Sequence, residues 1–115
     1  NILKDILNDR KITIKNPNAH FNNAVYIGDL IDFLCSVVNN LPNGKNVFTI
    51  SSAGSISLIE MINNIYHLTK RNPQISIIEP NGNSFMVSND KIESLGFYSR
   101  PISETINLFV KDNLL

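Results

Sequence analysis

The sequence predicts an α/β fold, a small three-layer fragment with a short parallel sheet. Three short apolar runs, at 24–27, 47–51 and 75–79, alternate with two amphipathic helical patterns, at 29–40 and 58–68. The runs show little alternation of polar and apolar residues, which is typical of strands buried in a parallel sheet. Their short connections favour right-handed crossovers, so the expected order is strand, helix, strand, helix, strand (βαβαβ).

The composition fits one modest domain that spans residues 1–115. Ten basic and ten acidic residues cancel, and no cluster of Lys or Arg indicates a nucleic-acid partner. No apolar run approaches the roughly 20 residues of a membrane span, so no membrane partner is expected. A single cysteine, Cys35, and no visible signal peptide favour a cytoplasmic setting. Because an amphipathic pattern starts directly at Asn1, we expect the chain to be part of a longer protein.

Two shorter elements precede the first apolar run. Apolar residues at helical spacing predict a helix at 2–9, and alternating β-branched residues predict a strand at 11–14. The Asn and Pro residues between 15 and 19 predict a turn. Nearer the other end of the chain, "FMVS", residues 85–88, is predicted to be a short strand or extended segment.

Asp29 lies where the strand at 24–27 gives way to a helix. Its carboxylate suits an N-cap, because it can accept a hydrogen bond from the amide of Asp32 and complements the positive helix end. Apolar residues cover more than half of the circumference of this helix, so we expect it to be buried on more than one side. Cys35 is expected in or near the core, since nothing in its surroundings favours a reactive thiolate.

The second helix has a clear start signal. Ser57 and Glu60 match a capping box, and an apolar stripe between 58 and 68 is expected in the core. The preceding "SSAGS" has amides that could bind an anion, but it lacks the Lys and spacing of a phosphate-binding loop, so ordinary capping is favoured. Further on, Gly96 is expected to end a short helix in a left-handed cap, with Phe97 folding back. In the last helix the residues expected to face inward are Ile102, Ile106, Phe109 and Val110.

A series of motifs runs in a familiar order and spacing over nearly the whole chain. They are "ILKDILNDRKITI", "AVYIGDLIDFL", "VFTISSAGSISLIEMI", "ISIIEPNGN", "NDKIESLGFYSRP" and "ISETINLFV". Together they resemble the C-terminal, substrate-binding part of the extended short-chain dehydrogenases, the family of NAD-dependent nucleotide-sugar epimerases and dehydratases. The resemblance implies a larger parent enzyme whose N-terminal Rossmann half is absent from this chain.

That half carries the catalytic and cofactor residues of the family, so the resemblance implies none here and places NAD or NADP in the parent enzyme. The chain has no GxxGxxG, and its one Tyr-x-x-x-Lys match, Tyr66 to Lys70, lies inside a predicted core helix. The implied partners are a nucleotide sugar and the missing Rossmann half. Without that half we expect exposed apolar surface and a homo-oligomer that buries it. The residues expected to be exposed are Val25, Ile27, Phe33 and Val47.

The resemblance also implies substrate-binding positions. The family binds a diphosphate with two arginines, and Asn22 occupies the position of one, while "EPNGN" occupies the turn of the other. Arginine suits a diphosphate because it is always charged and donates in pairs. The strand "ITIK" corresponds to the edge that holds the nucleobase through backbone groups. The candidate substrate-binding residues are Thr13, Lys15, Asn22, Asn23, Asn81 and Asn83.

Two other functions stay open. The chain could be a standalone binding or scaffold module that lacks chemistry, or part of an atypical short-chain reductase whose substrate is not a nucleotide sugar. The missing arginines motivate the second possibility. A metal site is not expected, because His20 and His67 have no Cys, His or carboxylate at ligand spacing.

Overall fold

The computed structural model describes residues 1–41, 43–80 and 82–114. In chain order its elements are α1 (Ile2–Leu7), β1 (Ile12–Lys15), β2 (His20–Phe21), α2 (Ile27–Val38), β3 (Ile56–Ser57), α3 (Leu58–Thr69), β4 (Ile75–Ile78), α4 (Asp90–Glu93) and α5 (Ile102–Asn113). β1 and β4 pair in parallel, in a register from Ile12↔Ile75 to Lys15↔Ile78, and β2 and β3 form an antiparallel pair. The α/β class with a short parallel sheet is confirmed. None of the described helices has the length and apolar character needed to cross a membrane.

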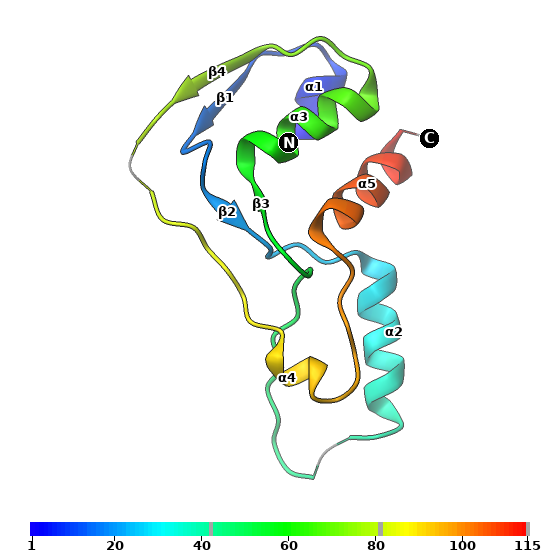
Figure 1. The fold of residues 1–115 in the computed structure, drawn as a ribbon. Helices are drawn as coiled ribbons and strands as arrows, with labels where there is room; N and C mark the ends of the chain where they lie inside the picture. Colours follow the sequence, from blue (N-terminus) through cyan, green and yellow to red (C-terminus); the bar gives the residue numbers. More distant parts are fainter. Residues whose placement is uncertain (42, 81, 115) are drawn as a thin grey trace.

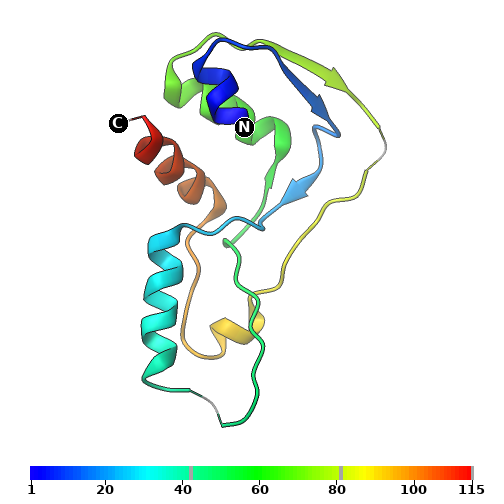
Figure 2. The same cartoon turned by 180° about the vertical axis from the view of Figure 1, so that it is seen from behind.

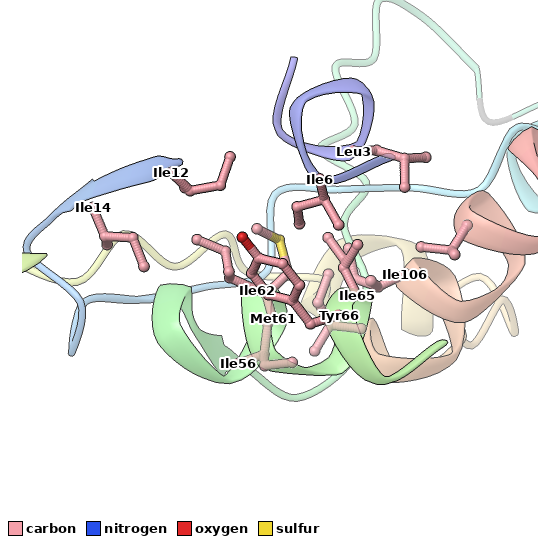
Figure 3. Packing of buried hydrophobic residues seen from close by; sticks show 12 residues of the cluster. Leu3, Ile6, Ile12, Ile14, Ile56, Met61, Ile62, Ile65, Tyr66 and Ile106 are labelled. Atoms are coloured by element: carbon pink, nitrogen blue, oxygen red, sulfur yellow. The ribbon is translucent and has the colours of Figure 1, made fainter. Parts of the chain in front are cut away.

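The main core lies where β1 meets the helices α1, α3 and α5 (Figure 1). β1 alternates, so that Ile12 and Ile14 are buried in this core, whereas Thr13 and Lys15 are exposed on the other face. Side chains from every one of these elements meet in a single cluster (Figure 3). Its buried members are Leu3, Ile6, Ile12, Ile14, Ile56, Met61, Ile62, Ile65, Tyr66, Ile102, Ile106 and Val110.

The predicted capping box starts α3. The Ser57 hydroxyl accepts a hydrogen bond from the Glu60 amide at 3.3 Å, and the Glu60 carboxylate accepts one from the Ser57 amide at 2.9 Å. The Glu60 carboxylate also accepts from the Ser57 hydroxyl, and these bonds lower the pKa of Glu60. This cap fixes the first turn of the helix that supplies more buried core residues than any other element.

The molecule is long and thin. Figures 1 and 2 show the β1·β4 pair with α1 and α3 at one end, and α2 with α4 at the other. Its extents are 51 × 37 × 18 Å and its radius of gyration is 16.5 Å. A compact domain of this length has a radius of gyration of about 13 Å. The chain therefore spreads its elements over a wider area than a self-contained domain does.

The strands predicted at 24–27 and 47–51 are wrong: residues 24–26 and 47–51 form no strand, and Ile27 already belongs to α2. Hydrogen bonds from side chains take the place of the backbone hydrogen bonds that a neighbouring strand would have made. The Asn89 amide accepts from the Ser51 N–H at 2.9 Å and donates to the Ser51 carbonyl at 3.1 Å. The Ser52 N–H is shared between the carbonyls of Asn22 and Ala24, at 3.0 Å each. The backbone is thus satisfied without a neighbouring strand.

Asn22 ties three segments together. Its side-chain amide donates to the Ser51 hydroxyl at 3.2 Å, the Ser52 carbonyl at 3.2 Å and the Val87 carbonyl at 2.9 Å. Its side-chain oxygen accepts from the Val87 N–H at 2.8 Å. Asn22 is 4% exposed, and Ser51, Ser52 and Asn89 around it are also buried. This polar junction joins the two ends of the molecule.

The helix α2 differs from prediction in its burial. Only Phe33 is buried, against Phe48 and Phe97 with ring centroids 6.0 and 5.0 Å away. Burial on more than one side and a core position for Cys35 are both wrong, since the opposite face, Cys35 included, is exposed. Nothing in the described chain covers that face. Phe33 itself was expected to be exposed, whereas Ile27 and Val47 are exposed as predicted.

The C-terminal elements largely follow the sequence. Gly96 has φ +84° and closes the turn after α4, and the Phe97 amide returns to the Ile92 carbonyl at 3.2 Å, as predicted. In α5 the inward residues include Thr105, whereas Phe109 is 43% exposed. The expected inward position of Phe109 is therefore wrong, because the groove beside it is left open.

Replacing Asn22 tests the polar junction. Asn22→Ala leaves the partly buried Val87 N–H without its acceptor and removes three donated hydrogen bonds, and we expect it to lower the free energy of unfolding by about 2–3 kcal/mol. Urea unfolding followed by circular dichroism measures the change. The neighbouring Asn23 is exposed, so Asn23→Ala should stay within about 0.5 kcal/mol of the parent. Equal losses in both variants would contradict the assignment.

Candidate functional site

A polar pocket opens at the carboxyl ends of β1 and β4. It has a volume of about 390 Å³ and is lined by residues that directly follow the two strands: Asn16, Pro17 and Asn18 after β1, and Glu79, Pro80, Gly82 and Asn83 after β4. In open α/β sheets, ligands bind at the carboxyl ends of parallel strands, because the connecting loops leave a crevice there. The pocket is therefore the candidate functional site of this chain.

One wall is the turn that follows β1, and backbone hydrogen bonds hold it. Asn16 has φ +54°, a left-handed conformation that Asn tolerates, and its amide donates to the Ile78 carbonyl at 3.1 Å. The first amides of α3 bind the same turn: Leu58 donates to the Ala19 carbonyl at 3.1 Å and Ile59 to the Pro17 carbonyl at 3.0 Å. This wall is fixed to the strand pair and to the core helix at once.

The other wall follows β4 and is fastened on its far side to β2. The Ser84 hydroxyl accepts from the His20 amide at 3.0 Å, and the Phe85 amide donates to the His20 carbonyl at 2.9 Å. Gly82 lies directly on the Asn16 side chain, and a Cβ at this position would collide with the Asn16 amide. The two walls therefore touch, and a larger residue at Gly82 would have to displace the Asn16 side chain.

The pocket's polar side chains have no partner within the described chain. No hydrogen bond or ion pair occupies the side chains of Asn16, Asn18, Glu79 or Asn83 there. The amides offer both donors and acceptors, and the carboxylate accepts only. Two proline rings supply apolar surface beside them. Such a lining suits hydrogen bonding to a polar molecule.

The start of α3 offers no anion site. Its first amides are taken by the Glu60 carboxylate, by the carbonyls of Ala19 and Pro17, and by the Ser57 hydroxyl. An anion at a helix N-terminus needs free amides. The preference for capping over anion binding at "SSAGS" is confirmed.

The structure separates the residues predicted from the sequence as substrate contacts. Asn83 lines the pocket. Thr13 and Lys15 lie on the exposed face of β1 and do not line it, and Asn81 is outside the described residues. Asn23 is exposed beside the buried Asn22, whose amide is already fully bonded within the chain. Substrate contact by each of these residues stays a prediction.

The pocket also contains three polar residues absent from the predicted set: Asn16, Asn18 and Glu79. Their signal was present in the sequence. "KNPNA" and "EPNGN" each follow a predicted strand, and the carboxyl ends of parallel strands share one edge of a sheet. The pairing of β1 with β4 was the missing information.

Asp29 was predicted to be the N-cap of α2. This prediction is wrong, because the helix begins two residues earlier at Ile27. Its carboxylate instead forms a two-pronged ion pair with Arg100, at 2.8 and 2.9 Å. The hydrogen bonds from Arg100 lower the pKa of Asp29, against the opposing effect of partial burial. The pair fastens α2 to the segment that leads into α5.

This ion pair predicts a pH dependence. A lowered pKa stabilises the fold above the ordinary aspartate range near pH 3.9, and the contribution is lost as pH falls through that range. At pH 7 we expect Asp29→Asn to lower the free energy of unfolding by about 1–2 kcal/mol. The difference from the parent chain should shrink as pH falls below about 3.9 and through the lowered pKa of Asp29, as measured by urea unfolding across pH.

The exposed Asp32, on the next turn of α2, serves as the control, and Asp32→Asn should change stability by less than about 0.5 kcal/mol. A difference between Asp29→Asn and the parent that stays constant down to pH 2.5 would contradict the role of the ion pair.

Tyr66 is a structural residue. It is 3% exposed, and its hydroxyl accepts from the Gln74 amide at 3.2 Å and faces the Gln74 carbonyl at 3.4 Å. This contact joins the end of α3 to the start of β4. Because the Tyr66 side chain is buried, the Tyr-x-x-x-Lys spacing from Tyr66 to Lys70 presents no catalytic pair at the surface. Among the described residues, no three His, Cys, Asp or Glu side chains gather as metal ligands would.

The tyrosine contact can be tested by removing one oxygen. Tyr66→Phe should lower the free energy of unfolding by about 1 kcal/mol, because the Gln74 amide loses its buried partner. Thermal unfolding gives the measurement. Tyr98 is 75% exposed, so Tyr98→Phe is the matched control and should have no effect. An unchanged stability for Tyr66→Phe would show that water replaces the hydroxyl.

A second cavity, of about 450 Å³, is mainly apolar and lies between the start of α2 and α5. Val25, Ile27, Ile106 and Phe109 contribute its apolar lining. At its rim Tyr26 donates to the Asp112 carboxylate at 2.9 Å, a bond that raises the pKa of Tyr26. This apolar groove is continuous with α2 through Ile27.

Comparison with known proteins gives a clear result for the fold. Searches by sequence find no matching protein-family model and no matching curated protein. By structure, the chain is similar to UDP-glucuronic acid 4-epimerase from Bacillus cereus, solved with NAD (TM-score 0.76, 16% identity), over 96% of this chain and 38% of that one.

Two further enzymes show the same likeness. The dTDP-4-dehydrorhamnose reductase of Bacillus anthracis, in complex with NADP, matches with a TM-score of 0.74 and 14% identity, over 97% of this chain and 42% of that chain. UDP-glucose 4-epimerase from Thermotoga maritima, with UDP-glucose, matches with a TM-score of 0.71 and 16% identity, over 96% and 37%. The chain thus spans about two fifths of the length of the enzymes whose fold it shares.

Proposed function

We propose that this chain, which has the fold of one part of the nucleotide-sugar epimerases and dehydratases, is the substrate-binding portion of an NAD(P)-dependent enzyme of that kind. Residues 1–115 would form one substrate-binding domain, and a separate N-terminal Rossmann half would hold the cofactor and the catalytic groups. The observation that carries the proposal is the match of nearly the whole chain to only about two fifths of each enzyme.

The surface supports a missing partner. The chain exposes 7547 Å², whereas a monomeric protein of its mass exposes about 6,300 Å². Several of the large apolar side chains that are exposed lie on α2. Ile27, Ile31, Leu34 and Val38 recur at helical spacing on one face and are 53–69% exposed. We call this the α2 face, and the apolar groove beside α5 extends it.

Exposed apolar patches of this kind mark interaction surfaces. The occupant that we propose for the α2 face is the cofactor half, since the matched enzymes carry further chain and this chain lacks the catalytic spacing on its surface. Burial of four large aliphatic side chains provides a substantial driving force for that association. A reducing, cytoplasmic setting is part of the proposal, and the exposed thiol of Cys35 fits it.

The substrate-binding role rests on the pocket at the ends of β1 and β4. The matched enzymes include structures with UDP-glucose and UDP-glucuronic acid, and we propose a nucleotide sugar as the ligand here too. The turn residues Asn16, Asn18 and Asn83 would contact it. The epimerisation or dehydration itself would use groups outside this chain.

Cys35 provides a direct test, because it lies on the exposed side of α2. The longer protein that contains both halves should carry the cofactor motif GxxGxxG and the catalytic motif Tyr-x-x-x-Lys ahead of Asn1. In the protein that contains both halves, N-ethylmaleimide should modify Cys35 at least about tenfold more slowly than in the 115-residue chain, because the α2 face is covered. Mass spectrometry follows the reaction.

Ile31→Asp should restore the fast modification and lower NAD(P)-dependent turnover, since it places a charge in the contact. Ser36→Asp adds the same charge to the exposed, polar side of α2 and is the matched control. Absence of both motifs, or equal reactivity of Cys35 with and without the other half, would overturn the proposal. Slow modification of the isolated chain together with a doubled mass in light scattering would assign the α2 face to a second copy instead.

A further inference from the structure

The loop after α2 contains an asparagine followed directly by a glycine, Asn43–Gly44. Glycine has no side chain, so its backbone nitrogen can approach the amide of a preceding asparagine with little obstruction. Residues 43–46 are all exposed. Figures 1 and 2 show this loop at the end of the molecule away from α1 and α3. A second such pair in the sequence, Asn81–Gly82, includes a residue outside the described ones.

The surroundings of Gly44 are open. A Cβ built on Gly44 would meet no atom within 4 Å, whereas one built on Gly82 would collide with the Asn16 side chain. Within the described chain, no hydrogen bond uses the Gly44 N–H or the side chain of Asn43. The Asn46 side chain donates to the backbone carbonyls of Asn43 and Gly44, but both distances are long, at 3.4 Å. Both groups needed for a reaction between Asn43 and Gly44 are therefore free.

We propose that Asn43 deamidates in the folded protein, by attack of the Gly44 backbone nitrogen on the side-chain carbonyl carbon of Asn43. A new C–N bond closes a succinimide ring. The C–N bond of the side-chain amide breaks, and ammonia leaves with the proton that Gly44 has lost. Water from the solvent then opens the ring at either carbonyl. The products are aspartate and isoaspartate, in which the main chain runs through the former side chain.

The reaction requires the backbone of the loop to move until the Gly44 nitrogen reaches the Asn43 side chain. Segments with an exposed backbone and few buried contacts open at low free-energy cost. Gly44 has φ +85° and, as a glycine, passes readily between conformations that other residues avoid. The buried core cluster lies around α1, α3 and β1 and does not need to open. Folding is therefore expected to give Asn43 little protection.

Deamidation changes the loop in two ways. Both products add a negative charge beside the exposed Lys45. Isoaspartate also lengthens the main chain by a carbon between α2 and the segment 47–51. Because the loop is exposed, this product would be accessible to a carboxyl methyltransferase that recognises isoaspartyl linkages. An enzyme of this class is the partner that fits the modified loop.

The test incubates the 115-residue chain at mildly alkaline pH, with and without enough urea to unfold it. Tandem mass spectrometry of proteolytic peptides locates the deamidated residue, and an isoaspartyl-specific methyltransferase measures the isoaspartate. We expect Asn43 in the folded chain to react within about threefold of its rate in the unfolded chain. It should react at least about tenfold faster than Asn46, which is exposed in the same loop but precedes the β-branched Val47.

Two variants identify the attacking group. Gly44→Ala places a methyl group beside the attacking nitrogen and should slow the reaction of Asn43 at least about fivefold. Gly54 has φ +70° and equally open surroundings, and it follows an alanine. Gly54→Ala is therefore the matched control and should leave the rate at Asn43 unchanged.

A rate at Asn43 more than about tenfold lower in the folded chain than in urea would show that the loop protects it, and would overturn the inference. Equal rates in the parent and in Gly44→Ala would exclude the Gly44 nitrogen as the attacking group and overturn it too. Formation of aspartate without isoaspartate would indicate direct hydrolysis of the side chain, with the same consequence.

Discussion

One buried asparagine holds the two ends of this molecule together. The side-chain amide of Asn22 can donate and accept at once without carrying charge, and it uses both functions on the segments around Ser51 and Val87. Its burial would be costly with any of these bonds unmade. The extended segments can do without a sheet ladder because this residue and Asn89 satisfy their backbone. The thin, elongated shape is thus compatible with a single connected structure.

Local patterns in the sequence predicted local structure well. The capping box at Ser57, the left-handed cap at Gly96 and the strand pair's two runs depend on neighbours within a few residues, and all are found. Errors in predicted burial concentrate on α2 and on the run at 47–51. The apolar residues of α2 and the run at 47–51 carry the pattern of buried elements, and the chain leaves their outer faces bare.

The pocket shows a different limit. Its polar side chains lie in two turns that contain Asn and Pro and that were predicted from the sequence. Only the parallel register of β1 with β4 brings these two turns to the same edge of the sheet. The resemblance to nucleotide-sugar enzymes predicts Asn22 as a substrate contact, although Asn22 is buried. It does not predict Glu79, which lines the pocket. A residue's place in a motif says little about its exposure, because exposure depends on which distant segment packs beside it.

The pairing of β1 with β4 has a consequence for how the protein folds. Residues 12–15 must meet residues 75–78, which lie 63 positions further along the chain, and closing so long a loop is slow compared with forming α3. The pocket walls lie just beyond these strands. The pocket therefore forms late, after synthesis has passed β4, and a nascent chain that stops short of it has the core helix but no pocket. Ligand present during folding would stabilise only molecules that have completed this last pairing.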